Sequence, residues 1–271
     1  MSIKTNELIS AVEDFAPPGI QEPWDNSGWQ INFDYEEVSK VLVALEVTSD
    51  VIAEAKNHGI KLILTHHPVL FTPIKSIDHS TMIGRYLLDL IAEDVSVYAA
   101  HTSFDAARGG MNDTLAEAFG LVNVVPFPPI GKIASDVAKI NGRMLRVGEL
   151  EKPEKFSEII LRAEDLFDMK DRLKVVGSPD AVIRKIAVCG GGGGSFVKDM
   201  IGEDVDLYIT SDIRHDDAKL AGESGIALID GGHYGTEKHF VPIISGRLRH
   251  IFGDALTIIE TETSADPFKG K

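Results

Sequence analysis

The chain has 271 residues, of which 44% are hydrophobic and 25% are charged, the composition of a globular protein that can bury a sizeable core. Its formal net charge of −15 is spread along the sequence, which argues against an extended nucleic-acid surface because such a surface needs clustered lysines and arginines. The single cysteine, Cys189, excludes an intrachain disulfide and a multi-thiolate metal site, so any bound metal must be held by histidine and carboxylate.

The sequence shows no sign of a membrane or secretory destination. Asp, Glu and His residues interrupt every apolar run before it reaches the length needed to cross a bilayer. The first residues also lack the basic and then apolar pattern of a signal peptide. We therefore expect a cytoplasmic protein with no membrane partner.

The N-terminal part of the chain predicts one helix, a polar turn and a strand. Apolar residues at helical spacing predict a helix over residues 3–16, which Pro17-Pro18-Gly19 would end. Residues 22–30 form a polar turn bracketed by both tryptophans of the protein, and we expect the indoles to anchor this turn to the core. The nearly continuous apolar run of residues 40–47 predicts a strand that is covered on both faces.

A strand–helix–strand unit continues from that strand. Thr48-Ser49-Asp50 supplies a helix N-cap, and His58-Gly59 closes the helix before a second strand over residues 61–65. This spacing is typical of a βαβ unit, whose two strands are parallel. The next predicted elements are a helix around residues 82–92, a strand over 95–100 and a helix from about 110 to 119.

The middle of the chain contains its clearest break, the proline- and glycine-rich stretch 126–131. Beyond it the pattern predicts an antiparallel strand pair or extended edge, further helices, and further strands. The extended stretch is 139–150, the helices cover 153–166, a segment from about 196, and 215–224, and the strands cover 175–176, 182–188, 206–210 and 226–230.

We expect an α/β protein of two lobes with mostly parallel, helix-covered sheets. The first lobe would cover residues 1–125 and the second residues 126–271, and the C-terminal segment from about 231 to 271 is a candidate for packing on the first lobe. A cleft would lie at the carboxyl ends of the strands, where open parallel sheets place their ligands. Both lobes would contribute metal ligands.

The strongest functional signal is that three predicted strands end in imidazole or carboxylate groups. The first ends in His66 and His67, the second in His101 with Asp105 four residues later, and the third leads to His233-Tyr-Gly-Thr-Glu237. Two residues four apart on a helix lie on one face, a geometry that zinc proteases also use. Three such strand ends together predict a metal site, which a single histidine pair would not.

A pair of divalent ions fits this set of groups. Two carboxylates leave such a pair with net positive charge, so the site can hold a small anionic, nucleotide-like substrate. Imidazole with carboxylate suits Zn, Fe, Mn, Ni or Co equally well.

The five glycines 190–194 permit three interpretations. A strand, glycines and then a helix is the layout that presents backbone N–H groups to phosphate, and Asp212 falls near the acidic position of a dinucleotide site. The third glycine of that fingerprint is absent, so a tight turn that lets the helix pack closely is the favoured interpretation, with contact to a substrate phosphate as the third. The segment Thr210-Ser211-Asp212 has three equally supported roles: it supports metal ligands, caps a helix or contacts the substrate.

The motifs taken together resemble the GTP cyclohydrolase I type 2 homolog family, the Nif-three-like dinuclear metal-centre proteins. The resemblance covers about residues 5–260, and its most specific parts are the His-His-Pro and Gly-His-Tyr-x-Thr-Glu motifs. The motifs, in order, are Trp24-Asp-Asn-Ser-Gly28, Thr65-His-His-Pro68, His101-Thr-Ser-Phe-Asp105, the glycine run, Thr210-Ser-Asp212 and Gly232-His-Tyr-Gly-Thr-Glu237.

The resemblance implies a toroidal homohexamer and a definite ligand set. In that set His67 and Asp105 hold one ion, His66 and His233 hold the other, and Glu237 bridges both. His101 lies beside the centre as a proton shuttle or weaker ligand. One position departs from the family pattern, because Asp216 stands where a histidine is common, with His215 beside it.

The resemblance also implies hydrolysis of a nucleotide-like substrate, since some members are described as GTP cyclohydrolases, which open the guanine ring with water. Two other functions stay open. One is a metal-dependent phosphatase or phosphodiesterase, and the other is metal binding without turnover, as in a metallochaperone.

Overall fold

The computed structural model describes residues 2–127 and 144–268, and these fall into two compact units. Unit 1 contains the described residues up to Phe104 and from His239 onward, and unit 2 contains those from Asp105 to Lys238. The backbone therefore passes from unit 1 to unit 2 after Phe104 and returns after Lys238. No helix in the described residues is long and apolar enough to span a membrane.

Unit 1 is built on a five-stranded sheet in the order β13-β4-β5-β6-β2. The strands β13, β4, β5 and β6 are parallel neighbours, and β2 runs antiparallel to β6 at one edge. Their bounds are Gly28–Ile31 (β2), Lys40–Ala44 (β4), Leu62–Thr65 (β5), Ser96–Ala99 (β6) and Thr257–Glu260 (β13), with a separate small ladder of Ile3–Lys4 (β1) and Glu37–Val38 (β3).

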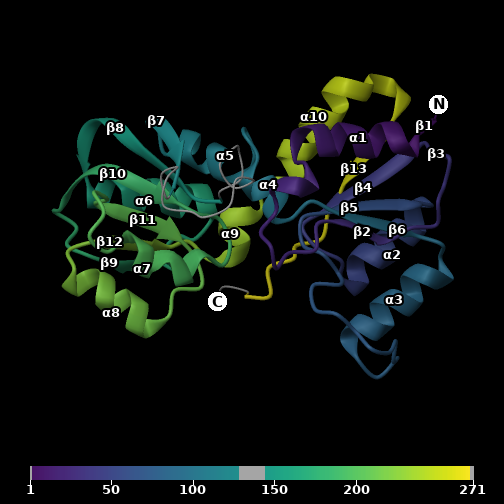
Figure 1. Ribbon diagram of the computed structural model, residues 1–271, viewed down its shortest axis with the longest axis horizontal. Coiled ribbons are helices and arrows are strands. Elements are labelled where there is room, and N and C mark those ends of the chain that lie inside the picture. Colours follow the sequence, from purple (N-terminus) through teal and green to yellow (C-terminus); the bar gives the residue numbers. More distant parts are fainter. Residues whose placement is uncertain (1, 128–143, 269–271) are drawn as a thin grey trace. The chain divides into compact units, whose positions relative to one another are not determined.

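Helices cover both faces of this sheet, as Figure 1 shows, with α1 and α10 on one side and α2 and α3 on the other. The helices of unit 1 are α1 (Thr5–Phe15), α2 (Ser49–His58), α3 (Met82–Ala92) and α10 (Phe240–Phe252), with short 3₁₀ turns at Pro18–Ile20 and Gly253–Ala255. A further helix, α4 (Thr102–Ala106), begins in unit 1 and runs into unit 2.

The βαβ unit predicted from the sequence is confirmed, and its local causes are visible. The Thr48 side chain accepts a hydrogen bond from the backbone N–H of Val51 at the start of α2, and Gly59 closes that helix with a φ of 61°. The strands β4 and β5 that it connects are parallel. Because both faces of the sheet are covered, all four residues of β5 are buried.

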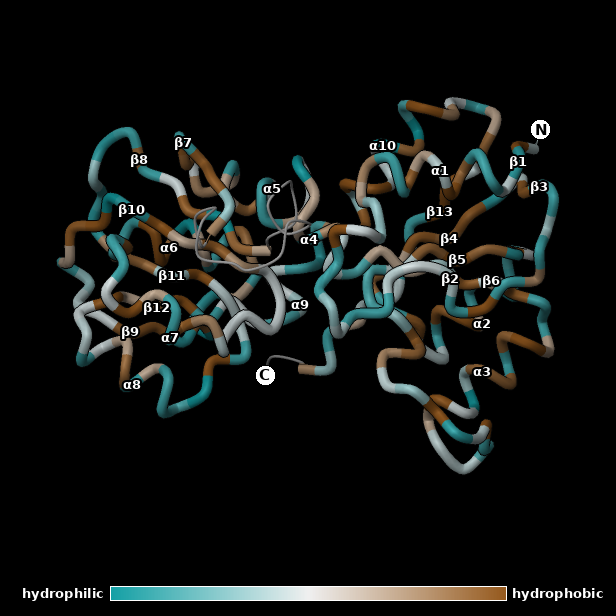
Figure 2. The backbone as a smooth tube through the Cα atoms, in the orientation of Figure 1, coloured by the Kyte–Doolittle hydropathy of each residue, from teal (hydrophilic) through white to brown (hydrophobic). Residues whose placement is uncertain are grey.

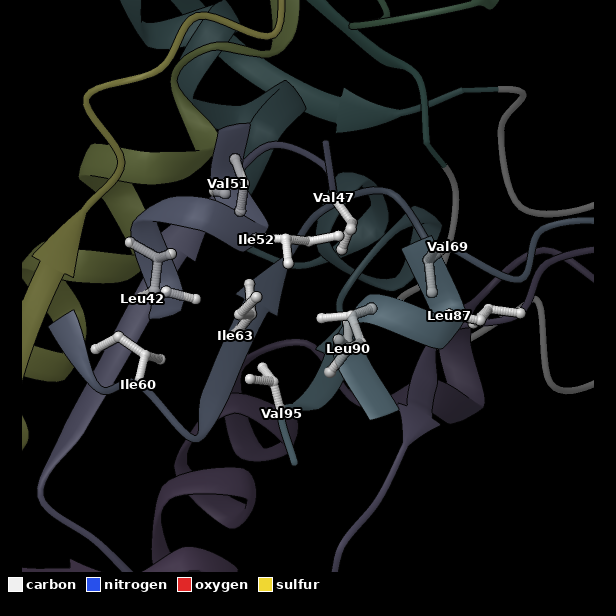
Figure 3. Packing of buried hydrophobic residues seen from close by; sticks show 13 residues of the cluster. Leu42, Val47, Val51, Ile52, Ile60, Ile63, Val69, Leu87, Leu90 and Val95 are labelled. Atoms are coloured by element: carbon white, nitrogen blue, oxygen red, sulfur yellow. The ribbon is translucent and has the colours of Figure 1, made fainter. Parts of the chain in front are cut away.

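The core between the sheet and the α2–α3 layer is made of aliphatic side chains (Figure 3). Leu42 and Ile63 come from the strands, Ile52 from α2 and Leu90 from α3, and all four are buried. This packing holds the carboxyl ends of β5 and β6 in a fixed register, with Thr65 opposite Ala99.

Unit 2 contains a six-stranded mixed sheet in the order β7-β8-β10-β11-β12-β9. Only β10, β11 and β12 are parallel, and the outer pairings are antiparallel. The strands are β7 (Leu121–Pro126), β8 (Arg146–Lys155), β9 (Lys174–Val176), β10 (Val182–Val188), β11 (Leu207–Thr210) and β12 (Ala227–Asp230), and the helices are α5 (Met111–Ala118), α6 (Phe156–Phe167), α7 (Val197–Met200), α8 (His215–Glu223) and α9 (His233–Glu237).

The core of unit 2 follows the same alternation of apolar strand and amphipathic helix. The backbone coloured by hydropathy shows apolar stretches concentrated in the strands (Figure 2). Ala187 and Tyr208 of the sheet pack in one buried cluster with Val197 and Met200 of α7. With two such units, the mixed α/β class expected from the sequence is confirmed, although the sheet of unit 2 is less parallel than predicted.

The helix predicted from Pro153 is wrong at its start, because β8 continues to Lys155 and α6 begins only at Phe156. Proline can lie in this strand because the ladder with β10 is interrupted there, with Ile183 opposite Glu154 but Lys185 opposite Glu149. The extended stretch predicted over 139–150 is described only from residue 144, and the predicted break at 126–131 only to residue 127.

Candidate metal centre

Three histidines meet at the carboxyl end of the unit 1 sheet. His66 and His67 follow β5 directly, and His101 follows the neighbouring strand β6. One nitrogen of each ring can be chosen so that the three donor atoms all lie within 4.8 Å of one another. The parallel pairing of β5 and β6 is what brings them together, because it places both carboxyl ends at one edge of the sheet.

The strand-end turn that carries His66 and His67 is held by the backbone. The N–H groups of both histidines donate to the Leu45 carbonyl, at 3.1 and 2.9 Å, and the Thr65 hydroxyl donates to the His67 carbonyl at 2.9 Å. These hydrogen bonds fix the backbone from which both imidazoles project.

The buried ring of His66 is oriented by its surroundings. Its Nδ1 lies 2.8 Å from the Ala100 carbonyl oxygen, and its ring packs on those of Phe240 and Phe104 with centroids 5.2 and 6.0 Å away. A carbonyl can only accept, so Nδ1 carries the hydrogen and Nε2 carries the lone pair in the neutral ring. A neutral histidine held in this way is oriented to ligate a metal through Nε2.

A loop carboxylate, Asp25, orients His101. Its Oδ1 accepts a hydrogen bond from His101 Nδ1 at 2.6 Å, and its Oδ2 accepts from the Thr102 backbone at 3.0 Å and from the Ser27 hydroxyl at 2.9 Å. Burial by itself would raise the pKa of Asp25, but the hydrogen bond and charge of His101, with the bonds from Thr102 and Asn26, hold that pKa well below its usual range. Asp25 is therefore a fixed anion beneath the imidazole.

The sequence interpretation missed Asp25 because it treated the turn as anchored by tryptophans. That expectation is wrong for Trp24, which is 56% exposed, whereas Trp29 packs edge-on to Tyr98 with ring centroids 5.3 Å apart. The carboxylate, and not the indole of Trp24, holds the turn against the start of α4. The only sequence signal was the presence of an acid next to a tryptophan in the Trp-Asp-Asn-Ser-Gly motif.

Unit 2 brings together a second set of donors at the end of β12. The strand turns through Gly231 and Gly232 into the short helix α9, which places His233 and Glu237 on one face, as predicted. His233 Nε2 lies 3.1 Å from Glu237 Oε2. This is the distance of a direct ion pair between the two side chains, and it is also about the separation of two ligands that each bind one transition-metal ion at about 2.0–2.1 Å.

Asp212 supports His233 from the end of β11. Its Oδ2 lies 2.7 Å from His233 Nδ1, the arrangement in which a carboxylate fixes the tautomer and orientation of a metal-binding histidine. Of the three interpretations of Thr210-Ser211-Asp212, this geometry favours support of a ligand. The helix that follows, α8, has Arg214 as its N-cap residue and no side-chain cap, and Asp216 is exposed in its first turn.

The glycine run provides the space that Glu237 occupies. A Cβ atom at Gly191 would lie 1.9 Å from Glu237 Oε1, and one at Gly193 would lie 2.3 Å from the Thr210 hydroxyl. Gly191 also has a φ of +63°, which disfavours any side chain. The last two glycines of the run belong to a 3₁₀ turn, Gly193–Phe196, which leads into only four residues of α7, so the geometry favours close packing over a dinucleotide fingerprint.

The remaining predicted ligand, Asp105, lies at the start of unit 2 within α4 and is buried. Its backbone carbonyl accepts a hydrogen bond from the Asn112 side-chain amide at 3.3 Å. The Asn112 side-chain oxygen in turn accepts from the Gly190 N–H at 2.7 Å. Asn112 therefore connects the segment of Asp105 to the glycine run inside unit 2.

The sequence from residue 3 to residue 267 matches the Duf34/NIF3 (NGG1p interacting factor 3) family. The chain belongs to the Duf34/NIF3 family. Among its relatives, the GTP cyclohydrolase 1 type 2 homolog of Clostridium perfringens is 33% identical over 269 residues, which cover 98% of this chain and 99% of the relative. That of Clostridium acetobutylicum is 32% identical over 275 residues, which cover 100% of both chains. The resemblance found in the motifs is therefore confirmed.

Solved structures agree with the Duf34/NIF3 assignment at the level of the fold. The Bacillus cereus protein related to NIF3 matches with a TM-score of 0.86 at 24% identity, over 99% of each chain. Reduced HcgD from Methanocaldococcus jannaschii matches with a TM-score of 0.79 at 28% identity, over 97% of this chain and 99% of that chain. The described residues of this Duf34/NIF3 protein also contain clustered histidine and acidic groups that could hold a metal ion.

Replacing Asp25 by Asn tests its role beneath His101. We expect the variant to lose about 2–3 kcal/mol of unfolding free energy, because the charge-assisted bonds from His101, Ser27 and Thr102 are weakened together. Urea unfolding at neutral pH measures this loss. Asp34→Asn, in an exposed turn of the same unit, is the matched control and should change stability by no more than about 0.5 kcal/mol.

Proposed function

We propose that this Duf34/NIF3 protein binds two divalent metal ions through His66, His67, Asp105, His233 and Glu237, and uses them to hydrolyse a nucleotide-like substrate. The observation that carries the proposal is that imidazole Nδ1 atoms are within hydrogen-bond distance of an acceptor. His66 Nδ1 lies 2.8 Å from a backbone carbonyl oxygen, and His233 Nδ1 lies 2.7 Å from a carboxylate oxygen. Outer partners of this kind are characteristic of metal-binding histidines.

His101 fits the same pattern, because its Nδ1 lies 2.6 Å from Asp25 Oδ1. His67 Nδ1 lies 3.5 Å from a carboxylate oxygen of Glu46, which is the separation of an ion pair. Any buried imidazole needs an acceptor for its N–H, so one such contact has little weight. Three rings held at Nδ1 in this way, two of them at neighbouring strand ends, favour metal binding over the packing role that a single histidine usually has.

Chain connectivity supports the use of one centre by donors from both units. Asp105 directly follows Phe104, whose ring contacts His66, and Glu237 is three residues before Phe240, whose ring also contacts His66. Three residues of extended chain span at most about 11 Å. The backbone therefore limits how far each acid can lie from His66, because each acid lies next to a point where the chain passes from one unit to the other.

The residues around the ligands supply the rest of the proposed chemistry. Divalent ions at this site would supply Lewis acidity and compensate the charge of an anionic substrate. His101 is placed to accept and donate a proton, since Asp25 holds its Nδ1 and stabilises the ring when it is charged. The chain is strongly acidic, with a net charge of −15, so bound cations would also be needed to attract an anion.

The proposed substrate class is based on the relatives named GTP cyclohydrolase 1 type 2 homolog.

The test of the proposed hydrolysis is to incubate metal-loaded protein with GTP and with a panel of phosphoesters, and to measure formate, ring-opened product and orthophosphate. Formate release supports ring opening, orthophosphate alone supports a phosphatase, and no turnover with Zn, Fe, Mn, Ni or Co supports metal binding without catalysis. His101→Gln is expected to keep its metal and to lose about 100-fold or more in rate.

We also propose that the protein assembles as a homohexameric ring, as the resemblance to Nif-three-like proteins implies. The expected mass in solution is six times the 29.5 kDa of one chain. Light scattering after gel filtration measures it, and a monomer at micromolar concentration would contradict the proposal.

A further inference from the structure

Two large aromatic side chains are held on the surface beside His101. Trp24 is 56% exposed and Phe71 is 51% exposed, whereas Val69, two residues before Phe71, is buried. Their rings lie with centroids 5.9 Å apart, and each is close to the imidazole of His101, at 6.1 Å for Trp24 and 5.9 Å for Phe71. Such distances are within the range of aromatic contact.

These rings are fixed by the residues next to them in the chain. Trp24 precedes Asp25, whose carboxylate is bonded to the start of α4. Phe71 follows Leu70, whose carbonyl accepts a hydrogen bond from the Asn26 amide at 2.9 Å and whose N–H donates to the Gln30 side chain at 3.1 Å.

The two loops that carry the aromatic rings are therefore tied to each other. The Gln30 side chain, which is only 8% exposed, donates in turn to the Asn26 carbonyl at 2.7 Å. This buried amide closes the network between the segment of Trp24 and the segment of Phe71. The network fixes the backbone on either side of the two exposed rings relative to each other.

We infer that Trp24 and Phe71 form a stacking platform for the planar ring of the substrate, a nucleobase, next to His101. The inference rests on the proposed function for its substrate class. A fixed, exposed aromatic surface lowers the entropic cost of binding a flat ring, and base–aromatic stacking tolerates any base because every base has a π-face. The position beside His101 would put the ring of the substrate where proton transfer is proposed.

The experiment uses intrinsic fluorescence, because the protein has only two tryptophans. In a Trp29→Phe background of the full-length protein, loaded with zinc, Trp24 is the single indole. We expect GTP and guanosine to quench its emission saturably and inorganic tripolyphosphate to leave it unchanged. Calorimetric titration gives the Kd of both ligands, and Phe71→Ala should raise the Kd for GTP about tenfold and leave that for tripolyphosphate unchanged. Ile77→Ala, an exposed apolar residue of the same loop, is the matched control and should change neither.

The outcomes separate this inference from the proposed function. Saturable guanosine binding without hydrolysis of any substrate would uphold the platform and overturn the hydrolase. Hydrolysis of GTP with a Kd unaffected by Phe71→Ala would overturn the platform and leave the hydrolase standing. A smaller assembly mass for Phe71→Ala, with nucleotide binding unchanged, would assign these rings to a contact between copies of the chain and would also overturn the platform.

Discussion

Glu237→Gln is expected to remove most of the metal that the protein binds. The amide has the shape of the carboxylate but no charge, and Glu237 is buried to 3% exposure beside His233, with Gly191 leaving room for nothing larger. Loss of an outer partner of a metal site typically costs 10- to 100-fold in affinity, so loss of a bridging acid should cost more than about 100-fold. Elemental analysis of purified protein measures the metal content, and turnover should disappear with it.

The control for this variant is Glu223→Gln, an exposed acid at the end of α8 in the same unit. It should bind metal as the unmodified protein does. Because glutamine preserves volume, metal-free Glu237→Gln should still unfold cooperatively, which circular dichroism can show. A Glu237→Gln protein that retains two metal ions per chain would refute the ligand set.

Gly191→Ala is expected to disable the same site through the backbone. The added methyl group would meet Glu237 Oε1 at 1.9 Å, in a residue whose φ is +63°. Left-handed conformation costs alanine about 1 kcal/mol and overpacking typically adds 1–3 kcal/mol, so we expect a loss of about 2–4 kcal/mol in the metal-free protein. Metal affinity should fall at least about tenfold, because the carboxylate is displaced from His233. Urea unfolding and metal titration measure the two effects.

Gly202→Ala separates the two causes. Gly202 has a φ of +80° in the same unit, but a Cβ atom there would meet nothing within 4 Å. This variant should lose only the stability that the left-handed backbone conformation costs an alanine, about 1 kcal/mol of unfolding free energy, and should bind metal normally. Equal losses of stability and affinity in Gly191→Ala and Gly202→Ala would show that the contact with Glu237 has no role.

Several features of the site follow from local sequence alone. The apolar runs before His66 and His101 form buried parallel strands, and residues after neighbouring parallel strands must share one edge of a sheet. The spacing of His233 and Glu237 likewise places them on one face of a helical turn wherever that turn lies. These predictions succeeded because each depends only on the periodicity of a helix or strand. None depends on a contact between residues that are far apart in the sequence.

Other features depend on contacts between segments far apart in the chain. Asp25 is 76 residues from His101, which it orients, and Gly191 is 46 residues from Glu237, which it accommodates. Neither separation corresponds to the periodicity of a helix or strand, so no sequence pattern could reveal these contacts. The return of the chain to unit 1 at His239, where α10 packs on the sheet of the first strands, is also a result of tertiary packing.

The sequence by itself determined the class of donors, the strands that end in them and the family to which the chain belongs, because composition, periodicity and motif are local properties. The tertiary structure decided which nitrogen of His66, His101 and His233 has a hydrogen-bond partner, which glycine leaves space for Glu237, and which aromatic rings are exposed beside His101. The physical reason is that hydrogen-bond partners and excluded volume are set by whichever atoms folding brings within a few ångströms, and separation along the chain does not limit which atoms those are.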